Sequence, residues 1–206
     1  MNYKEPFPGL LFFGILRHMN EIVQEGVKVL REIAKPLPEE LFGSDKLSHL
    51  IADMSEALDK KPEGVALAAP QVGVSWRLFI VRKDRALPPP SSDARGGSTA
   101  KSDLAVEPPQ QEVEVYINPE IIKTSRKHAR GDEGCLSVNG VYGVTNRHER
   151  VTISARRVDG SRFTRGGGGL LAQIFEHEID HLNGILFIDH AENLVQATSD
   201  KNEPAT

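Results

Sequence analysis

The segment from Gln173 to Gly184 constrains the fold most, because it places His177 and His181 four residues apart in a stretch with helical periodicity. Side chains at positions i and i+4 of a helix share one face, so both imidazoles can reach a single metal ion. Glu178 lies beside them, where a carboxylate can accept a proton from an activated water. Two chance histidines on an exposed helix are the weaker interpretation, because apolar residues surround the pair. These are Leu170, Leu171, Ile174 and Leu182.

Size and composition limit the class of protein. The chain has 206 residues, enough for one domain with tails. Its 25 basic and 29 acidic side chains give a net charge of −4 without a basic block, so we expect no specific nucleic acid partner. Its one cysteine, Cys135, cannot form an internal disulfide, and no apolar stretch is long enough to span a membrane. We therefore expect a cytoplasmic protein without a membrane partner.

The chain divides into a central domain and polar or irregular segments. Residues 1–18 are interpreted as an N-terminal extension, residues 19–190 as the domain, and residues 191–206 as a polar, frayed tail. Residues 84–111 are rich in Pro, Ser, Gly and Ala, a composition that buries too little apolar surface to become ordered. We interpret them as a flexible insertion at the tip of a β-hairpin.

Hydrophobic periodicity predicts a further helix and several strands. Ser44 can cap a helix whose apolar residues from Leu47 to Leu58 follow helical spacing, and this helix should cover one face of a sheet. Short apolar or alternating segments predict strands at 78–81, 112–117, 151–155 and 162–164. The glycine run 166–169 should open the metal-site helix. Because the Lys-Ser/Thr of a phosphate-binding P-loop is missing after it, we expect no bound nucleotide.

A catalytic tetrahedral metal site needs three protein ligands and one open position, so the two histidines leave one ligand to find. A third His later in the segment would complete one known pattern, but Phe187 occupies that position. A Glu from a later helix would complete another, yet the remaining glutamates lie in the polar tail. Cys135 stands between Gly134 and Leu136 in a tight extended segment. A lone cysteine more often packs in a core, but the missing ligand favours a thiolate here.

Three separated motifs stand in a characteristic order along the chain. They are Gly64-Val65-Ala66-Leu67-Ala68-Ala69-Pro70-Gln71, Glu133-Gly134-Cys135-Leu136-Ser137 and His177-Glu178-Ile179-Asp180-His181. In order and spacing they resemble the motifs of the peptide deformylases, and the similarity extends from about Ile22 to Asp189. The resemblance implies an α+β fold in which antiparallel sheets pack around a central metal-binding helix. It also implies removal of the N-formyl group from nascent bacterial-type or organellar polypeptides.

The resemblance assigns the metal site and the proton carrier. Cys135, His177 and His181 would hold one divalent ion, for which Fe²⁺ is favoured and Zn²⁺, Ni²⁺ and Co²⁺ are alternatives. Glu178 would accept a proton from the attacking water and later deliver one to the leaving amine. Expected partners are N-formyl-methionyl nascent peptides, met near the ribosome.

The resemblance also implies how the substrate is held. The side-chain amide of Gln71 and the backbone N–H of Leu136 would stabilise the formyl oxygen. The predicted substrate-binding positions are Val65, Ala66, Gly134, Leu170 and Ile174. Of these, Val65, Leu170 and Ile174 would line a pocket for the methionine side chain, although they would serve equally well as core.

Glu133 is expected to support a metal ligand and to pair with a basic residue such as Arg147. Two positions depart from the family pattern, because Ala66 stands where Gly is usual and Glu176 where many members have Gln. Three alternatives to deformylation stay open. They are a related metallohydrolase with a different amide substrate, a protein that binds peptide N-termini without hydrolysis, and a metal-binding structural protein.

Overall fold

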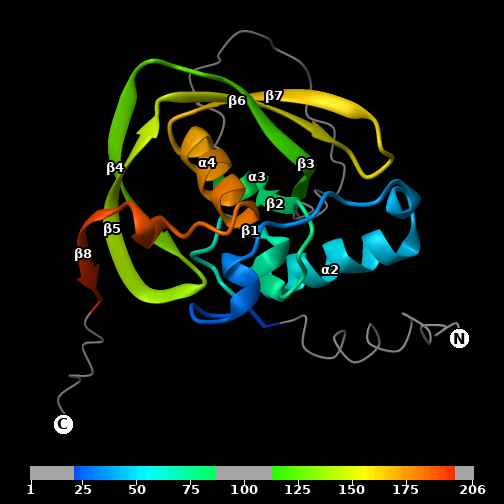
Figure 1. Ribbon diagram of the computed structural model, residues 1–206, viewed down its shortest axis with the longest axis horizontal. Helices are drawn as coiled ribbons and strands as arrows, with labels where there is room; N and C mark the ends of the chain where they lie inside the picture. Colours follow the sequence, from blue (N-terminus) through cyan, green and yellow to red (C-terminus); the bar gives the residue numbers. More distant parts are fainter. Residues whose placement is uncertain (1–20, 87–112, 198–206) are drawn as a thin grey trace, which may run out of the picture.

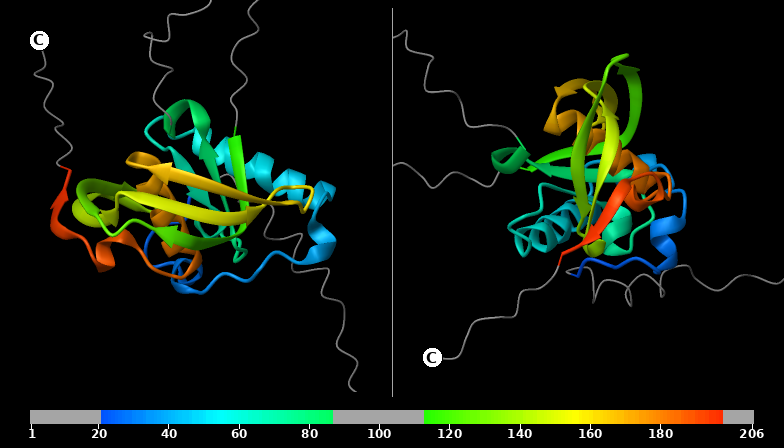
Figure 2. Two further views of the ribbon diagram at one scale, coloured as in Figure 1. Left: turned by 90° about the horizontal axis from the view of Figure 1, so that it is seen from above. Right: turned by 90° about the vertical axis from the view of Figure 1, so that its left-hand side faces the viewer.

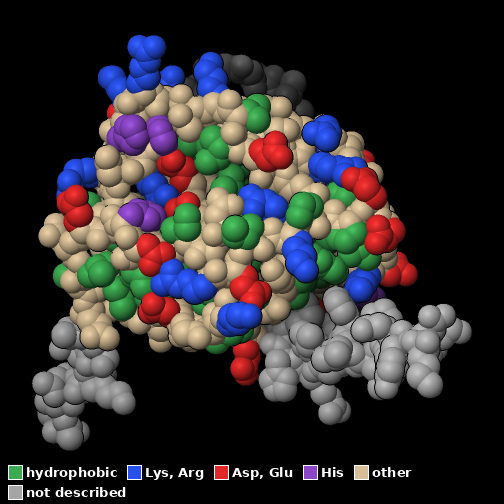
Figure 3. All heavy atoms as spheres, viewed as in Figure 1, with side chains coloured by type: hydrophobic (Ala, Val, Ile, Leu, Met, Phe, Trp, Pro, Cys, Tyr) green, Lys and Arg blue, Asp and Glu red, His purple; other side chains and the backbone are tan. Residues whose placement is uncertain are grey.

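The computed structural model describes residues 21–86 and 113–197. The extension predicted for residues 1–18, and residues 87–111 of the predicted insertion, lie outside the described residues. Within them, no helix is both long enough and apolar enough to cross a membrane. Acidic and basic side chains are interspersed over most of the face in Figure 3, and basic side chains gather only at its upper edge.

Two antiparallel sheets form the body of the described chain (Figure 1). The larger has the order β1-β2-β3-β6-β7, with bounds Ala66–Ala68, Leu78–Arg82, Val113–Thr124, Arg150–Arg156 and Arg162–Gly168. The smaller has the order β4-β5-β8, with bounds His128–Cys135, Val138–His148 and Glu192–Gln196. The strands predicted at 78–81, 112–117, 151–155 and 162–164 fall within β2, β3, β6 and β7, apart from residue 112, which is not described.

The two sheets are joined by a bend, because β3 continues into β4 and β5 continues into β6. Ser125 N–H donates to the Arg150 carbonyl at 2.9 Å, and Glu149 N–H donates to the Lys127 carbonyl at 3.0 Å. Figure 2 shows the resulting long, twisted ribbon from two further sides. The bend carries β4 and β5 around one side of the molecule, where they face the helix that follows β7.

Helix α2, Asp45–Asp59, confirms the expectation from its cap and its periodicity. The Ser44 hydroxyl oxygen accepts a hydrogen bond from the Leu47 N–H at 3.2 Å, which satisfies one of the free donors at the helix start. Its apolar face packs with residues of β1, β2 and β3, so the helix covers one face of the larger sheet as expected. Shorter helical segments are η2 Lys28–Arg31, η3 Glu39–Leu41, η4 Ala69–Val72, α3 Lys83–Ala86 and η5 Phe187–Asp189.

Helix α4, Leu170–Leu182, lies at the centre of the fold (Figure 1). It contacts β1, β5, β6 and β7, so strands of both sheets surround it. Its Phe175 packs edge-on against Tyr116 of β3 with ring centroids 5.4 Å apart. At the other end of the helix, a Cβ at Gly184 would lie 2.7 Å from the Arg31 carbonyl oxygen, so only glycine fits there. The predicted α+β architecture around a central helix is confirmed.

The glycine run does not open α4 as expected. Gly166–Gly168 belong to β7, and only Gly169 directly precedes the helix. A Cβ at Gly167 would lie 2.8 Å from Leu171 Cγ and 3.0 Å from a ring carbon of Phe175. Glycine is therefore needed in this strand because α4 packs directly onto its backbone.

Two further expectations need correction. Residues 192–196 are not frayed, because they form β8 and pair with β5, Tyr142 opposite Val195. Every residue of β8 is exposed, so backbone hydrogen bonds rather than apolar burial hold this strand. The predicted insertion begins too early, because α3 includes its first residues and buries Ala86.

Candidate metal centre

Three potential metal ligands converge from two elements. Cys135 is the last residue of β4, while His177 and His181 project from one face of α4. Their ligand atoms all lie within 4.8 Å of one another, and Cys135 Sγ is 3.2 Å from His181 Nε2. Among the described residues, no other group of three His, Cys, Asp or Glu side chains has this proximity. The fold therefore brings together the trio that the sequence predicts.

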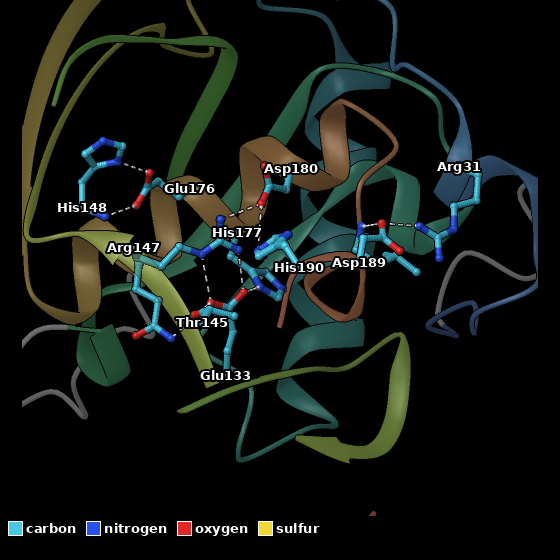
Figure 4. A network of polar contacts seen from close by, with 12 residues as sticks. Arg31, Glu133, Thr145, Arg147, His148, Glu176, His177, Asp180, Asp189 and His190 are labelled. Carbon is cyan, nitrogen blue, oxygen red and sulfur yellow. Dashed lines mark hydrogen bonds and ion pairs between the residues drawn. The ribbon is translucent and has the colours of Figure 1, made fainter. Parts of the chain in front are cut away.

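Glu133 orients one of these imidazoles (Figure 4). Its carboxylate accepts a hydrogen bond from His177 Nδ1 at 2.6 Å, and only 5% of the residue is exposed. Burial alone would raise the pKa of Glu133, but the contacts with His177 and Arg147 outweigh it and hold the pKa well below its usual range. The carboxylate is therefore ionised, so Nδ1 of His177 carries the proton and Nε2 is available to a metal.

Arg147 links Glu133 to the metal-site helix. Its Nε and Nη2 donate to the two Glu133 carboxylate oxygens at 3.0 and 2.7 Å, which confirms the expected ion pair. Its Nη1 donates to Asp180 of α4 at 2.7 Å. Thr145 completes the shell by donating to Glu133 at 2.6 Å. One buried network thus ties α4 to β4 and β5, and Figure 4 shows these side chains pointing toward one another.

Glu176, one of the two departures from the family pattern, also joins α4 to β5. Its carboxylate accepts hydrogen bonds from the His148 backbone N–H at 2.8 Å and from His148 Nδ1 at 2.6 Å. The side chain points away from that of His177, toward His148 at the end of β5 (Figure 4). Glu176 therefore has a structural contact of its own, directly next to a predicted ligand in sequence.

The donor set suits a divalent ion of intermediate softness, because it combines one thiolate sulfur with two imidazole nitrogens. Burial lowers the pKa of His181 well below its ordinary value, so this imidazole stays neutral and can donate its lone pair. Burial opposes protonation of His177 as well, but hydrogen bonds to Cys135 and Glu133 raise its pKa in the metal-free protein. A metal must displace that proton when it binds.

Glu178 is a buried carboxyl group directly beside the trio. It is only 3% exposed, and its Oε2 atom has no hydrogen-bond partner among the described residues. Burial raises the pKa of Glu178 to about 7, with a smaller contribution from the negative charge of Glu133. A carboxyl group with such a pKa can both accept and deliver a proton near neutral pH.

Gln71 lies in η4, and all but 1% of it is buried. Its Oε1 accepts a hydrogen bond from the Ala68 N–H at 2.8 Å, which fixes the orientation of the carboxamide. Its Nε2 then donates to Ser137 Oγ at 3.1 Å and lies 3.6 Å from Cys135 Sγ. Leu136 lies in the turn between β4 and β5, outside both strands, so the sheet does not use its N–H. Of the two predicted oxyanion donors, Gln71 Nε2 thus lies near the sulfur, and Leu136 directly follows Cys135 in the chain.

A cavity of about 260 Å³ opens onto these groups. Its lining includes Gln71, Cys135, His177 and Glu178, and the five predicted substrate-binding positions, Val65, Ala66, Gly134, Leu170 and Ile174. Ala66 lies in β1 opposite Val81, so its backbone is extended and does not require glycine. Tyr142 also lines the cavity, and a Cβ at Gly134 would lie 2.8 Å from its ring, so glycine lets this ring approach the strand.

Comparison with known proteins decides the family. The sequence model of the family described as "Polypeptide deformylase" matches residues 19–197. The chain belongs to the peptide deformylase family. It is therefore an enzyme of a metal-dependent family, and the Cys135, His177 and His181 cluster is the candidate site for the metal.

Two deformylases from bacteria and one solved structure illustrate the similarity. The chain is 39% identical over 183 residues to the peptide deformylase of Symbiobacterium thermophilum, which covers 89% of this chain and 71% of the relative. It is 38% identical over 176 residues to that of Carboxydothermus hydrogenoformans, covering 85% and 95%. The Met-Ala-Ser-bound class I type b peptide deformylase of Acinetobacter baumannii matches with a TM-score of 0.66 and 31% identity, covering 82% of this chain and 96% of that one.

Sequence reasoning missed several residues around the site. Thr145 and Asp180 complete the Glu133–Arg147 network, and His148 binds Glu176. Ser137 ends the motif that contains Cys135, but the sequence assigned it no role. In the structure its hydroxyl accepts a hydrogen bond from Gln71. These contacts join residues distant in sequence, so no local pattern marks them. The spacing of Asp180, three residues after His177, is the one available signal, because it places both on adjacent turns of one helix.

Proposed function

We propose that the chain removes the N-formyl group from the N-terminal formyl-methionine of nascent polypeptides and releases formate. The observation that carries the proposal is the unpaired, buried Glu178 carboxylate beside Cys135, His177 and His181, at a cavity that Gln71 also lines. A base, a metal-ligand set and an oxyanion donor within one cavity are the components of amide hydrolysis.

Cys135, His177 and His181 would hold one divalent ion, and Glu133 would keep the His177 ring in place through Nδ1. When bound, the ion polarises the formyl carbonyl and lowers the pKa of water. We propose Fe²⁺ as the ion used in the cell, with Zn²⁺, Ni²⁺ and Co²⁺ as ions that the same donor set accepts.

Glu178 serves as the proton carrier in this proposal. Its carboxylate accepts the proton of the attacking water and returns a proton to the nitrogen of the leaving amine, so no net proton stays on the enzyme. The products are formate and a peptide with a free methionine amine. A pKa raised to about 7 by burial suits both directions of transfer near neutral pH.

Gln71 and Leu136 stabilise the negative charge that forms on the formyl oxygen. If the Gln71 carboxamide rotated by 180°, its Oε1 would lose the hydrogen bond from the Ala68 N–H. Nε2 therefore stays directed toward the sulfur. The Leu136 backbone N–H is the second donor. Removing one such donor typically raises the barrier by about 3 kcal/mol.

The cavity beside these groups is proposed to bind the peptide. Val65, Leu170 and Ile174 offer apolar surface for the methionine side chain, while Ala66 and Gly134 lie where peptide backbone approaches. The similar Acinetobacter protein was solved with Met-Ala-Ser bound, which is a peptide with an N-terminal methionine. We place the reaction in the cytoplasm of a bacterial-type cell, near the ribosome, with an organelle as the alternative location.

Formate release is the test of this function. The metal-loaded protein should release one formate from each formyl-Met-Ala-Ser and leave acetyl-Met-Ala-Ser intact, because a formyl carbonyl lacks the methyl group that crowds the attack. Glu178→Ala is the matched control for a contaminating activity. Equal hydrolysis of the acetyl peptide would indicate a different amide substrate. Binding of Met-Ala-Ser with no formate from any formyl peptide would instead favour a peptide N-terminus binder.

A further inference from the structure

The segment Ile22–Glu25, which we call the strap, lies across the two loops that carry the proposed oxyanion donors. The Val23 N–H donates to the Gln71 carbonyl oxygen at 2.8 Å. The Glu25 N–H donates to the Ser137 carbonyl oxygen at 2.7 Å. The strap therefore joins η4 to the turn between β4 and β5, two segments far apart in sequence.

The strap is anchored by apolar side chains that point into different cores. Ile22 packs against the cluster of buried residues beneath α2, and Val23 packs against the cluster around Leu30 and Phe187. These contacts fix the backbone on both sides of Gln24, whose own side chain is exposed to solvent. Gln24 is therefore presented from a fixed backbone position.

Gln24 uses its side-chain amide on the active-site turn. Its Nε2 donates to the Leu136 carbonyl oxygen at 3.0 Å and to the Ile22 carbonyl oxygen at 3.2 Å. Both hydrogens of the amide are thus engaged, one on the strap and one on the turn. The turn follows an irregularity in the sheet, because the pairing of β4 with β5 shifts register between Gly134 and Cys135.

The Leu136 carbonyl is linked to two groups of the turn, the Ser137 N–H that contacts the Cys135 sulfur and the Leu136 N–H that is the proposed oxyanion donor. It belongs to the same peptide group as the Ser137 N–H, which donates to Cys135 Sγ at 3.4 Å. A hydrogen bond to the oxygen of a peptide group polarises it and strengthens its N–H as a donor. The orientation of Leu136 also sets the direction of its own N–H, the proposed oxyanion donor. One contact from Gln24 thus bears on the peptide group that donates to the Cys135 sulfur and on the residue that carries the proposed oxyanion donor.

We propose that Gln24 is a positioning residue for the reaction, holding the Leu136 turn so that its N–H and the Cys135 sulfur keep their places. The inference rests on the proposed function for its kinetic consequence only. Its structural consequence, a fixed peptide group between Leu136 and Ser137, is measurable without turnover.

The test compares four single variants of the full chain. Gln24→Ala removes the contact, and Gln24→Glu keeps the shape but replaces the donor by an acceptor facing the Leu136 oxygen. Gln24→Arg should restore the hydrogen bond to the Leu136 carbonyl oxygen. The arginine Nε occupies the same position along the side chain as the glutamine Nε2, and it also donates. Glu25→Ala is the matched control, because its strap contact is made by the backbone N–H and its side chain reaches Arg31 instead.

For Gln24→Ala and Gln24→Glu we expect kcat on formyl-Met-Ala-Ser to fall about 10-fold, less than the roughly 100-fold or more for a lost oxyanion donor, with KM within about 2-fold. Zinc content should equal that of the parent. Amide hydrogen exchange at Ser137, followed by NMR in the metal-free and zinc-loaded proteins, should accelerate in these two variants and not in Gln24→Arg or Glu25→Ala.

Unchanged kcat and unchanged Ser137 exchange in Gln24→Glu would overturn the proposal. So would an equal loss of kcat in Glu25→Ala, or a loss accompanied by loss of zinc, because either points to general destabilisation of the strap or the site. If the parent releases no formate, the proposed function fails, and the exchange measurement alone decides the role of Gln24.

Discussion

Replacing Glu133 by Gln tests whether the buried network holds the metal ligand. The change keeps the size of the side chain but removes the charge that faces Arg147, Thr145 and His177. Whichever way the new amide turns, its NH₂ group meets groups that already donate. The imidazole of His177 loses its charged acceptor, and Arg147 keeps only Asp180 as a charged partner.

Two magnitudes follow from these contacts. Loss of a carboxylate behind a ligating imidazole typically weakens metal binding by about 10- to 100-fold. Breaking a buried ion pair costs about 3 kcal/mol at the lower end of its range, which applies here because Arg147 retains Asp180. For a chain of this size that corresponds to a fall in Tm of roughly 6 to 12 °C.

Zn²⁺ affinity is measured by competition with a chromophoric chelator, and Tm by circular dichroism on the metal-free proteins, so that metal loss does not contribute to the shift. Glu149→Gln, an exposed glutamate in the turn between β5 and β6, is the control and should leave both values unchanged. If Glu133→Gln binds Zn²⁺ as tightly as the parent, the contact with His177 does not hold a ligand. The reasoning would then be refuted even if Tm falls.

Three further substitutions test other parts of the site. Cys135→Ala should abolish stoichiometric metal, and unchanged metal by elemental analysis would remove Cys135 from the ligand set. Glu178→Ala should keep its metal while losing most of its turnover, because it deletes the proton carrier and no ligand; loss of both would indicate a structural role. Ala66→Gly should raise kcat/KM for formyl-Met peptides by about 3- to 30-fold, chiefly through KM, because a methyl group leaves the cavity wall. No improvement, or one in kcat alone, would mean that this methyl does not obstruct the peptide.

Local patterns predicted the elements whose own residues carry a cap, a helical spacing or an apolar run. The Ser44 cap and the apolar spacing after it predicted helix α2, and the apolar run from Leu78 to Val81 predicted β2. β8 escaped detection because all of its residues are exposed and only its pairing with β5 makes it a strand. The sequence pattern assigned Gly167 to the start of a helix. Glycine is needed there because α4 packs closely on the strand, and such a tertiary contact leaves no local signal in the sequence.

The residues of the candidate site also divide into those that a local pattern marks and those that only a tertiary contact explains. The spacing of His177 and His181 on one helix could be read directly, and the need for a third ligand favoured Cys135. Gln71 has no local signal, since an isolated Gln in a turn is ordinary, and only the resemblance to a family singled it out. Gln24 could not be found at all, because its contact with Leu136 joins residues 112 positions apart.

Stoichiometric reconstitution tests the central claim most directly. Metal-free protein is titrated with Fe²⁺ under anaerobic conditions, and formate release from formyl-Met-Ala-Ser is recorded at each addition. A single site formed by Cys135, His177 and His181 predicts that the rate rises linearly and stops at one equivalent, while Cys135→Ala stays inactive throughout. Formate release before any metal is added, or a rate in Cys135→Ala equal to that of the parent, would contradict the account.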